Sequence, residues 1–181
     1  MSTVSLSLDE IFDLAKKTLL ANGCDDETAS ILSDLIRNAE RDGSLSHGLF
    51  RLPAYVSGLK SGKINGKGKP EVKKISASVI KVKGNNCLAP VVLSKGLPEL
   101  AKAAKENGVA VLAINNSHHM AAMWPETEKL AEEGLVAFAC TSYKPAVSLP
   151  SLVNPVPRGT LCPSLLATWT SPIAIEAVAI S

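Results

Sequence analysis

Apolar residues recur at intervals of three and four along residues 1–60, which is the spacing of one face of an α-helix. The capping-box pattern Ser7-Leu8-Asp9-Glu10 predicts where a first helix begins, and Asn22-Gly23 predicts its end. A second helix is expected after Asp25 or Asp26, ending by Asp42-Gly43, so that two antiparallel helices result. The two apolar stripes are Ile11, Phe12, Ala15 and Leu19, and then Leu32, Leu35, Ile36 and Ala39.

A third helical period runs over residues 49–59. It would place Ser46 at or just before a helix N-terminus, with His47 and Arg51 on one face because they are four residues apart. Pro53 interrupts this helix, since proline lacks a backbone donor and clashes with the preceding turn. The helix is therefore expected either to kink at Pro53 or to begin later.

Between residues 70 and 147 the pattern changes to strands and helices. Its second half reads as strand, helix, strand with short connections, a βαβ unit whose strands should be parallel with a right-handed crossover. In such units the unpaired amides and the dipole at the helix N-terminus favour anions, so an anion is expected to bind between the first strand and the helix, here at Asn115–Met123. The expected elements are strands Val72–Ile75 and Val79–Val82, a helix Ser94–Asn107, a strand Val109–Ile114, a helix from about Ala121 to Glu133, and a strand Leu135–Cys140.

The segment 148–181 shows no helix or strand period. From Pro145 onward only Arg158 and Glu176 are charged, and six of the eleven prolines fall there. We therefore predict an α/β region over residues 1–147, helical over 1–60 and with sheet and helices over 70–147, followed by a divergent proline-rich tail.

The composition, 46% hydrophobic and 20% charged residues with a net charge of +2, is that of a globular domain. The absence of a signal-peptide pattern and of an apolar run of about 20 residues predicts a cytoplasmic protein without a membrane partner. Four widely spaced cysteines indicate reduced thiols and no metal site. A lysine-rich block over residues 60–83 lacks aromatic residues and arginine, which favours a solvated surface over nucleic-acid binding.

Candidate chemistry is concentrated at Ser46-His47-Gly48-Leu49-Phe50-Arg51. Histidine exchanges protons near neutral pH, a hydroxyl can orient its ring, and arginine can hold a carboxylate. The same pattern also occurs where a serine caps a helix beside a solvated imidazole, so it leaves both readings open. The other two histidines, His118-His119, fit either a cofactor site or a polar loop. The chain contains no G-x-G-x-x-G sequence, which excludes an ordinary Rossmann turn.

Longer runs carry a family resemblance. The run Arg41-Asp42-Gly43-Ser44-Leu45-Ser46-His47-Gly48-Leu49-Phe50-Arg51-Leu52-Pro53 and the run Ser117-His118-His119-Met120-Ala121-Ala122-Met123-Trp124-Pro125-Glu126 resemble the malate/L-lactate dehydrogenase family of NAD(P)-dependent oxidoreductases. Within it, they are most similar to the Δ1-pyrroline-2-carboxylate/Δ1-piperideine-2-carboxylate reductases. The resemblance runs from about Leu6 to about Val147 and implies a non-Rossmann α/β fold, incomplete at the C-terminus because family members are longer.

The resemblance also implies roles for individual residues. It makes Ser46 part of a charge relay, His47 the proton donor and Arg51 the ligand of the substrate carboxylate. A substrate-binding threonine would correspond to Thr160, although Leu161-Cys162 stands where the family has Asn-Pro. The cofactor-binding segment would be His119, Met120, Ala121, Ala122 and Met123.

The implied reaction is NADPH-dependent reduction of the C=N bond of small cyclic imino acids to L-pipecolate or L-proline, with NADH as the other possible cofactor. One alternative is a malate- or lactate-type 2-hydroxy acid dehydrogenase. Another is a noncatalytic fragment that binds or dimerises, because the family aspartate that completes the relay has no counterpart here. The family further implies a homodimer.

Overall fold

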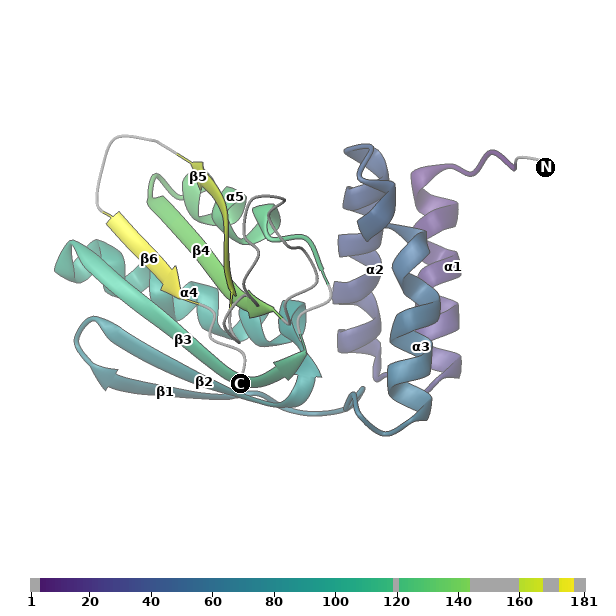
Figure 1. Cartoon of the computed structure of the whole chain (residues 1–181), viewed down its shortest axis with the longest axis horizontal. Coiled ribbons are helices and arrows are strands. Elements are labelled where there is room, and N and C mark those ends of the chain that lie inside the picture. Colours follow the sequence, from purple (N-terminus) through teal and green to yellow (C-terminus); the bar gives the residue numbers. More distant parts are fainter. Residues whose placement is uncertain (1–3, 119–120, 144–159, 168–172, 178–181) are drawn as a thin grey trace, which may run out of the picture. The chain divides into compact units, whose positions relative to one another are not determined.

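A computed structural model describes residues 4–118, 121–143, 160–167 and 173–177 (Figure 1). The chain divides into two compact units. Three helices form most of the first unit, and a sheet forms most of the second. The first unit comprises Met1–Pro70, Gly84–Val92 and Ser117–Ala122, and the second comprises Glu71–Lys83, Leu93–Asn116 and Met123–Ser181.

Both predicted N-terminal helices are confirmed. Helix α1 (Leu8–Ala21) begins with the predicted capping box, in which the Glu10 amide donates to Ser7 Oγ at 3.2 Å and the Ser7 amide donates to the Glu10 carboxylate at 2.8 Å. Helix α2 (Asp26–Arg41) is capped by Asp25, whose carboxylate accepts a hydrogen bond from the Thr28 amide at 2.9 Å. The cap is therefore Asp25 rather than Asp26.

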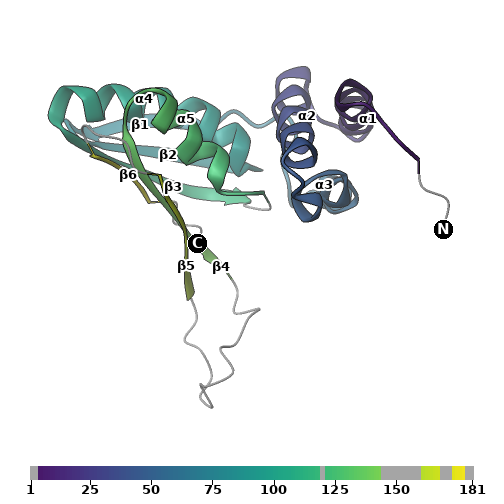
Figure 2. The ribbon, with the colours of Figure 1, turned by 90° about the horizontal axis from the view of Figure 1, so that it is seen from above.

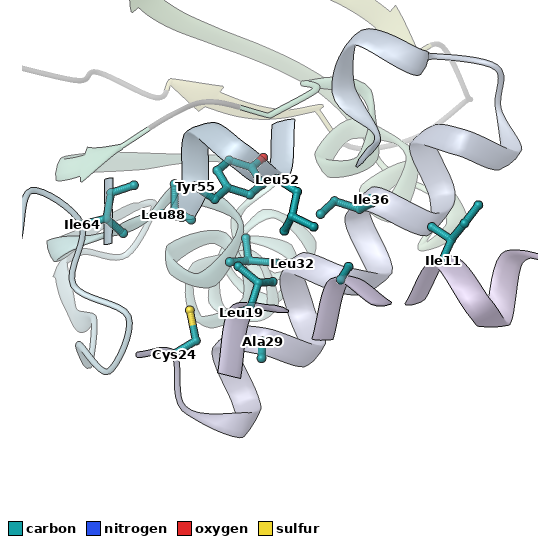
Figure 3. Close-up of a cluster of buried hydrophobic side chains, with 11 residues drawn as sticks. Ile11, Leu19, Cys24, Ala29, Leu32, Ile36, Leu52, Tyr55, Ile64 and Leu88 are labelled. Carbon is teal, nitrogen blue, oxygen red and sulfur yellow. The ribbon is translucent and has the colours of Figure 1, made fainter. Parts of the chain in front are cut away.

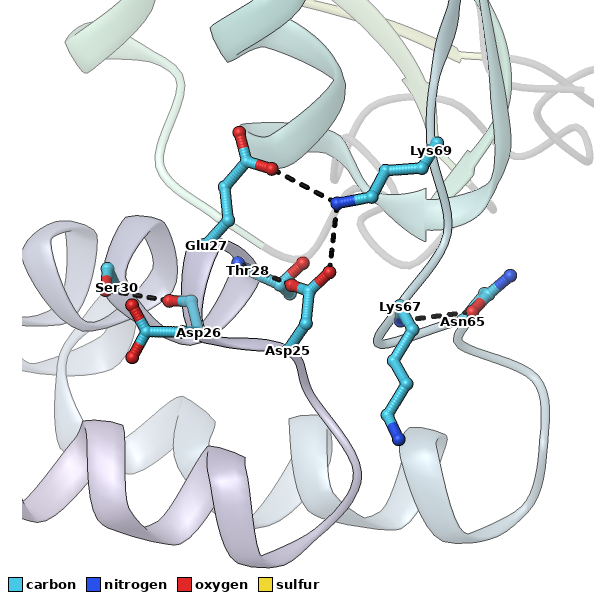
Figure 4. A network of polar contacts seen from close by, with 8 residues as sticks. All are labelled: Asp25, Asp26, Glu27, Thr28, Ser30, Asn65, Lys67 and Lys69. Carbon is cyan, nitrogen blue, oxygen red and sulfur yellow. Dashed lines mark hydrogen bonds and ion pairs between the residues drawn. The ribbon is translucent and has the colours of Figure 1, made fainter.

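The carboxylate of Asp25 also joins α2 to the loop that contains Lys69 (Figure 4). Lys69 Nζ lies 3.0 Å from Asp25 Oδ2 and 3.2 Å from Glu27 Oε2. Burial opposes ionisation of Asp25, but hydrogen bonds from Thr28 and Lys69 outweigh it, so the pKa of this carboxyl is lowered. Asp25 is consequently charged throughout the neutral range.

The core of the first unit is a cluster of apolar side chains from its helices, from the segments that follow α1 and the third helix, and from Leu88 (Figure 3). Leu19, Leu32 and Ile36 are fully buried, as the helical stripes predicted. Each such side chain stabilises the fold by about 1.5–3 kcal/mol relative to an exposed one. The cluster consists of Ile11, Ala15, Leu19, Cys24, Ala29, Leu32, Ile36, Leu52, Tyr55, Ile64 and Leu88.

The third helix begins later than its apolar period. Two 3₁₀ turns, η1 (Leu45–His47) and η2 (Leu49–Arg51), precede α3 (Leu52–Lys60). Pro53 lies in the first turn of α3, where a missing backbone donor breaks no helical hydrogen bond. Of the two expected outcomes, a kink or a later start, the structure has the later start.

The sheet has six strands in the order β1-β2-β3-β6-β4-β5. Strands β1 and β2 form an antiparallel hairpin, β6 pairs in parallel with both β3 and β4, and β5 pairs antiparallel to β4. Since β3 and β4 both run parallel to β6, they are parallel to each other, as predicted. The strands are β1 (Glu71–Ser76), β2 (Val79–Leu88), β3 (Val109–His118), β4 (Val136–Tyr143), β5 (Thr160–Ala167) and β6 (Ile173–Ala177).

Helices α4 (Ala89–Asn107) and α5 (Trp124–Glu132) lie on the same face of the sheet (Figure 2). Helix α4 begins at Ala89 rather than at the predicted Ser94, and α5 begins at Trp124 rather than near Ala121. Gly96 allows α4 to approach the sheet closely, because a Cβ there would lie 2.9 Å from Leu112 Cδ2 and 3.1 Å from Val82 Cγ2.

Two predictions about strands were wrong. Strand β3 extends to His118, so that Asn115–Ser117 belongs to a strand rather than to the predicted loop. The segment 148–181 was expected to contain no regular element, yet it supplies β5 and β6. Because β6 lies between β3 and β4, the predicted βαβ strands are parallel but not adjacent. A domain boundary at Val147 stays a prediction.

Candidate active site

The imidazole of His47 is held by two serine hydroxyls. Its Nδ1 lies 2.9 Å from Ser46 Oγ and 3.3 Å from Ser44 Oγ. The ring is placed by the 3₁₀ turn η1, in which the His47 amide donates to the Ser44 carbonyl at 2.8 Å. The expected contact between Ser46 and His47 is thus present, and Ser44 is a contact that the sequence argument missed.

The loop around Gly48 is clamped by Glu40, which the sequence argument also missed. Glu40 Oε1 accepts a hydrogen bond from the Leu49 amide at 2.7 Å. A Cβ at Gly48 would collide with the same carboxylate, so Glu40 can hold its present position only while residue 48 is glycine. Glycine directly after His47 was the available signal, since it marks a close approach of the backbone to another group.

Arg51 presents a buried nitrogen that lacks a partner. Within the described part of the chain, its Nε is shielded from solvent and has no hydrogen-bond acceptor. Its charge acts on two neighbouring side chains. Burial raises the pKa of Tyr55 to about 12 against the opposing effect of Arg51. Burial, and secondarily the charge of Arg51, lower the pKa of His47. An anion at Arg51 would satisfy this nitrogen and remove one cause of the lowered His47 pKa.

The second histidine stretch is only partly described. Ala121 and Ala122 are buried, whereas His119 and Met120 lie outside the described residues. Ser117 is buried, and its Oγ lacks a hydrogen-bond partner among the residues the structure describes. Met123 directly precedes α5.

The residues expected in the site are divided between the two compact units. The stretch Ser117–Ala122 belongs to the first unit, the same unit as Ser46, His47 and Arg51. Met123 and Thr160 belong to the second unit. Thr160 is the first residue of β5, and its backbone pairs with that of Tyr143 in β4.

Glu126, in the first turn of α5, is a further buried acid. Its side chain is 6% exposed, and its Oε2 has no hydrogen-bond partner within the described ranges. Burial raises its pKa to about 7, against the weaker opposing effects of a backbone amide and Lys129. In the sequence Glu126 stands out only as part of a motif, because a single glutamate on a helix does not signal burial.

Within residues 4–118, 121–143, 160–167 and 173–177, no three histidine, cysteine or acidic side chains are grouped so as to hold a metal ion. Cys24, Cys87 and Cys140 are free thiols. The described helices include none with the length and apolar character needed to cross a bilayer.

The family model described as malate/L-lactate dehydrogenase matches residues 6–155. A Δ1-pyrroline-2-carboxylate/Δ1-piperideine-2-carboxylate reductase of Pseudomonas syringae pv. tomato is 37% identical over 175 residues, which cover 97% of this chain and 48% of the reductase. The chain thus spans about half the length of this relative. The match continues past Val147, where the resemblance was expected to end.

Two solved structures share the fold. The crystal structure of Δ1-piperideine-2-carboxylate reductase from Pseudomonas syringae pv. tomato has a TM-score of 0.70 and 36% identity, covering 77% of this chain and 44% of that one. The malate dehydrogenase from Pyrococcus horikoshii OT3 has a TM-score of 0.75 and 29% identity, covering 80% of this chain and 42% of that one. The predicted non-Rossmann α/β class is therefore confirmed.

Proposed function

The chain belongs to the malate/L-lactate dehydrogenase family, and we propose that it serves the NADPH-dependent reduction of small cyclic imino acids. The substrates would be Δ1-piperideine-2-carboxylate and Δ1-pyrroline-2-carboxylate, and the products L-pipecolate and L-proline. The proposal draws its substrate class from relatives that bear these names. The observation that carries it is the buried Nε of Arg51, near His47, which has no hydrogen-bond partner among the residues that the structure describes.

Arg51 would bind the substrate carboxylate. A guanidinium offers two parallel donors to a carboxylate, and such a charge-assisted pair fixes both position and orientation. The imine carbon of the ring would thereby be held at a constant distance from the imidazole. Because the carboxylate cancels the charge of Arg51, its binding would also favour protonation of His47.

His47 would deliver the proton. In its charged form the imidazole donates to the imine nitrogen, and the resulting iminium carbon is a better acceptor of a hydride. Ser46 would hold Nδ1 and thereby leave Nε2 as the nitrogen that exchanges the proton. Bound NADPH would supply the hydride.

The residues that would hold the dinucleotide are His119, Met120, Ala121, Ala122 and Met123. Two observations fit such a group. The buried small side chains of Ala121 and Ala122 leave room for close approach, and the nearby Ser117 hydroxyl lacks a partner among the described residues. NADPH is proposed over NADH by resemblance to the reductases, and Thr160 is retained as a proposed substrate contact.

The test is NADPH consumption, followed by absorbance, with Δ1-piperideine-2-carboxylate. The chain is compared with a fusion to the remaining half of the Pseudomonas syringae reductase. Arg51→Met should lower kcat/KM about 10- to 100-fold, the loss expected for a hydrogen-bonded charge pair. Arg41→Met, which removes an exposed arginine near the end of α2, is the matched control. Equal activity of the two variants would contradict the role of Arg51.

A malate- or lactate-type dehydrogenase is the second candidate, favoured by the likeness to the Pyrococcus horikoshii malate dehydrogenase. Arg51 would hold the carboxylate of a 2-oxo acid equally well. A panel of imino and 2-oxo acids, each with NADPH and NADH, separates the two reactions. If no substrate is reduced by either protein and His47→Ala changes nothing, the chain is instead a noncatalytic binding or dimerising module. Sedimentation tests the proposed homodimer.

A further inference from the structure

Ser44 provides a second hydroxyl at the ring nitrogen that faces away from the proposed proton transfer. Its Oγ lies 3.3 Å from His47 Nδ1, and that of Ser46 lies 2.9 Å from the same atom. The two serines differ in exposure, since Ser46 is exposed and Ser44 is half-buried. Water therefore competes more strongly with the hydrogen bond between His47 Nδ1 and Ser46 Oγ than with the one between His47 Nδ1 and Ser44 Oγ.

The backbone of Ser44 is also fixed from both sides. Its amide donates to the carbonyl of Ala39 at 2.8 Å, near the end of α2, and its carbonyl accepts from the His47 amide at 2.8 Å. The hydroxyl of Ser44 is thus attached to the same short 3₁₀ turn that holds the imidazole. A side chain placed in this way loses little conformational freedom when it makes a hydrogen bond.

We propose that Ser44 is a positioning residue that shares with Ser46 the hydrogen bond to His47 Nδ1. An imidazolium that gives up its proton at Nε2 keeps the other proton on Nδ1, and that proton needs an acceptor. Two hydroxyl oxygens can share one N–H in a three-centre hydrogen bond, which both distances allow. The inference rests on the proposed role of His47 as proton donor, and it gives Ser44, together with Ser46, the role of keeping a proton on Nδ1 so that Nε2 exchanges.

The experiment is a pH titration of the histidine ring nitrogens by ¹⁵N NMR, done without substrate or cofactor. The chain has three histidines, so a His47→Gln variant assigns the resonances of His47. In the native chain the neutral ring should carry its proton on Nδ1. Ser44→Ala should lower the pKa of His47 further, because the hydrogen bond from the charged ring is stronger than the one from the neutral Nδ1–H ring, so the charged form loses more when an acceptor is removed. The double variant Ser44→Ala/Ser46→Ala should shift the neutral ring toward the Nε2–H form.

Ser44→Thr keeps the hydroxyl, so His47 should titrate in this variant as in the native chain. Ser57→Ala, at an exposed site in α3, should leave the titration of His47 unchanged. A neutral ring protonated on Nε2 in the native chain, or an unaltered titration in Ser44→Ala, would overturn the proposal. Where imino acid is reduced, the double variant should lower kcat/KM about 10- to 100-fold. If the titration behaves as expected but no imino or 2-oxo acid is reduced, the proposed function fails and the role of Ser44 at the ring stands.

Discussion

Replacing the buried Glu126 with glutamine should change how stability depends on pH. The carboxyl is 6% exposed, and burial raises its pKa from 4.5 to about 7. A group whose pKa is higher in the folded than in the unfolded chain stabilises the fold below the unfolded pKa. That stabilisation is lost as the pH rises through the folded value. Glutamine has nearly the same shape and does not ionise, so this loss should be absent in Glu126→Gln.

The magnitude follows from the two pKa values. A change from 4.5 to about 7, at about 1.4 kcal/mol for each pKa unit, corresponds to about 3 kcal/mol. The native chain and Glu126→Gln should therefore have similar free energies of unfolding near pH 4.5. Above pH 7 the glutamine variant should be more stable by about 3 kcal/mol, because the native chain then carries a buried charge that its neighbours only partly offset.

Urea unfolding at a series of pH values measures this difference. Trp124 lies in the same turn of α5 and reports the unfolding of the second unit by fluorescence, with Trp169→Phe as the background. Glu128→Gln, which removes an exposed acid from the same helix, is the matched control. The reasoning is refuted if Glu126→Gln and the native chain lose stability in parallel, or if the variant is the less stable protein at pH 8. The second result would mean that Glu126 is ionised and paired.

Three other substitutions test the packing and the helix cap, each by the free energy of unfolding in urea. Asp25→Ala should destabilise the chain by about 1 kcal/mol through loss of the cap. Because the pKa of Asp25 is lowered, this difference should shrink as the pH falls through the folded value, and an unchanged difference in acid would contradict it. Gly96→Ala should cost about 1–3 kcal/mol, since its Cβ would press on buried Leu112; a neutral effect would refute the close approach. Gly48→Ala should cost a similar amount and lower any measured activity, because the new Cβ displaces the carboxylate that holds the active-site loop; retained activity would count against that clamp.

The helices of the first unit could be predicted because their signals are local. The Ser7 capping box lies within four residues, and the apolar stripes repeat within one helix turn. The carboxylate of Glu40 was not predictable in this way. It reaches the Leu49 amide, nine residues further on, and only the folded turn brings the two groups together.

The sheet shows the corresponding limit for strands. A buried apolar run such as the one in β3 is recognisable from its residues, but its neighbours in the sheet are not. Strand β6 has five residues and lies between two strands that are nearer to each other in sequence than to it. Pairing over such a separation depends on the whole chain, and no period within residues 173–177 encodes it. The assignment of Met123 and Thr160 to the second unit, when Ser46, His47 and Arg51 belong to the first, was hidden for the same reason.

The nearness of Arg51 to His47 accounts for the order of events that the proposed reaction requires. Burial, and secondarily the charge of Arg51, make the imidazole harder to protonate in the free protein than in water. Arrival of a carboxylate at Arg51 cancels that charge and leaves only burial. In the proposed reaction, proton uptake by His47 would therefore be linked to the binding of an anionic substrate, and the serine hydroxyls at Nδ1 would direct the gained proton to the other nitrogen. A neutral analogue would occupy the same space without this effect, so an arginine four residues after the proposed proton donor would favour acids as substrates.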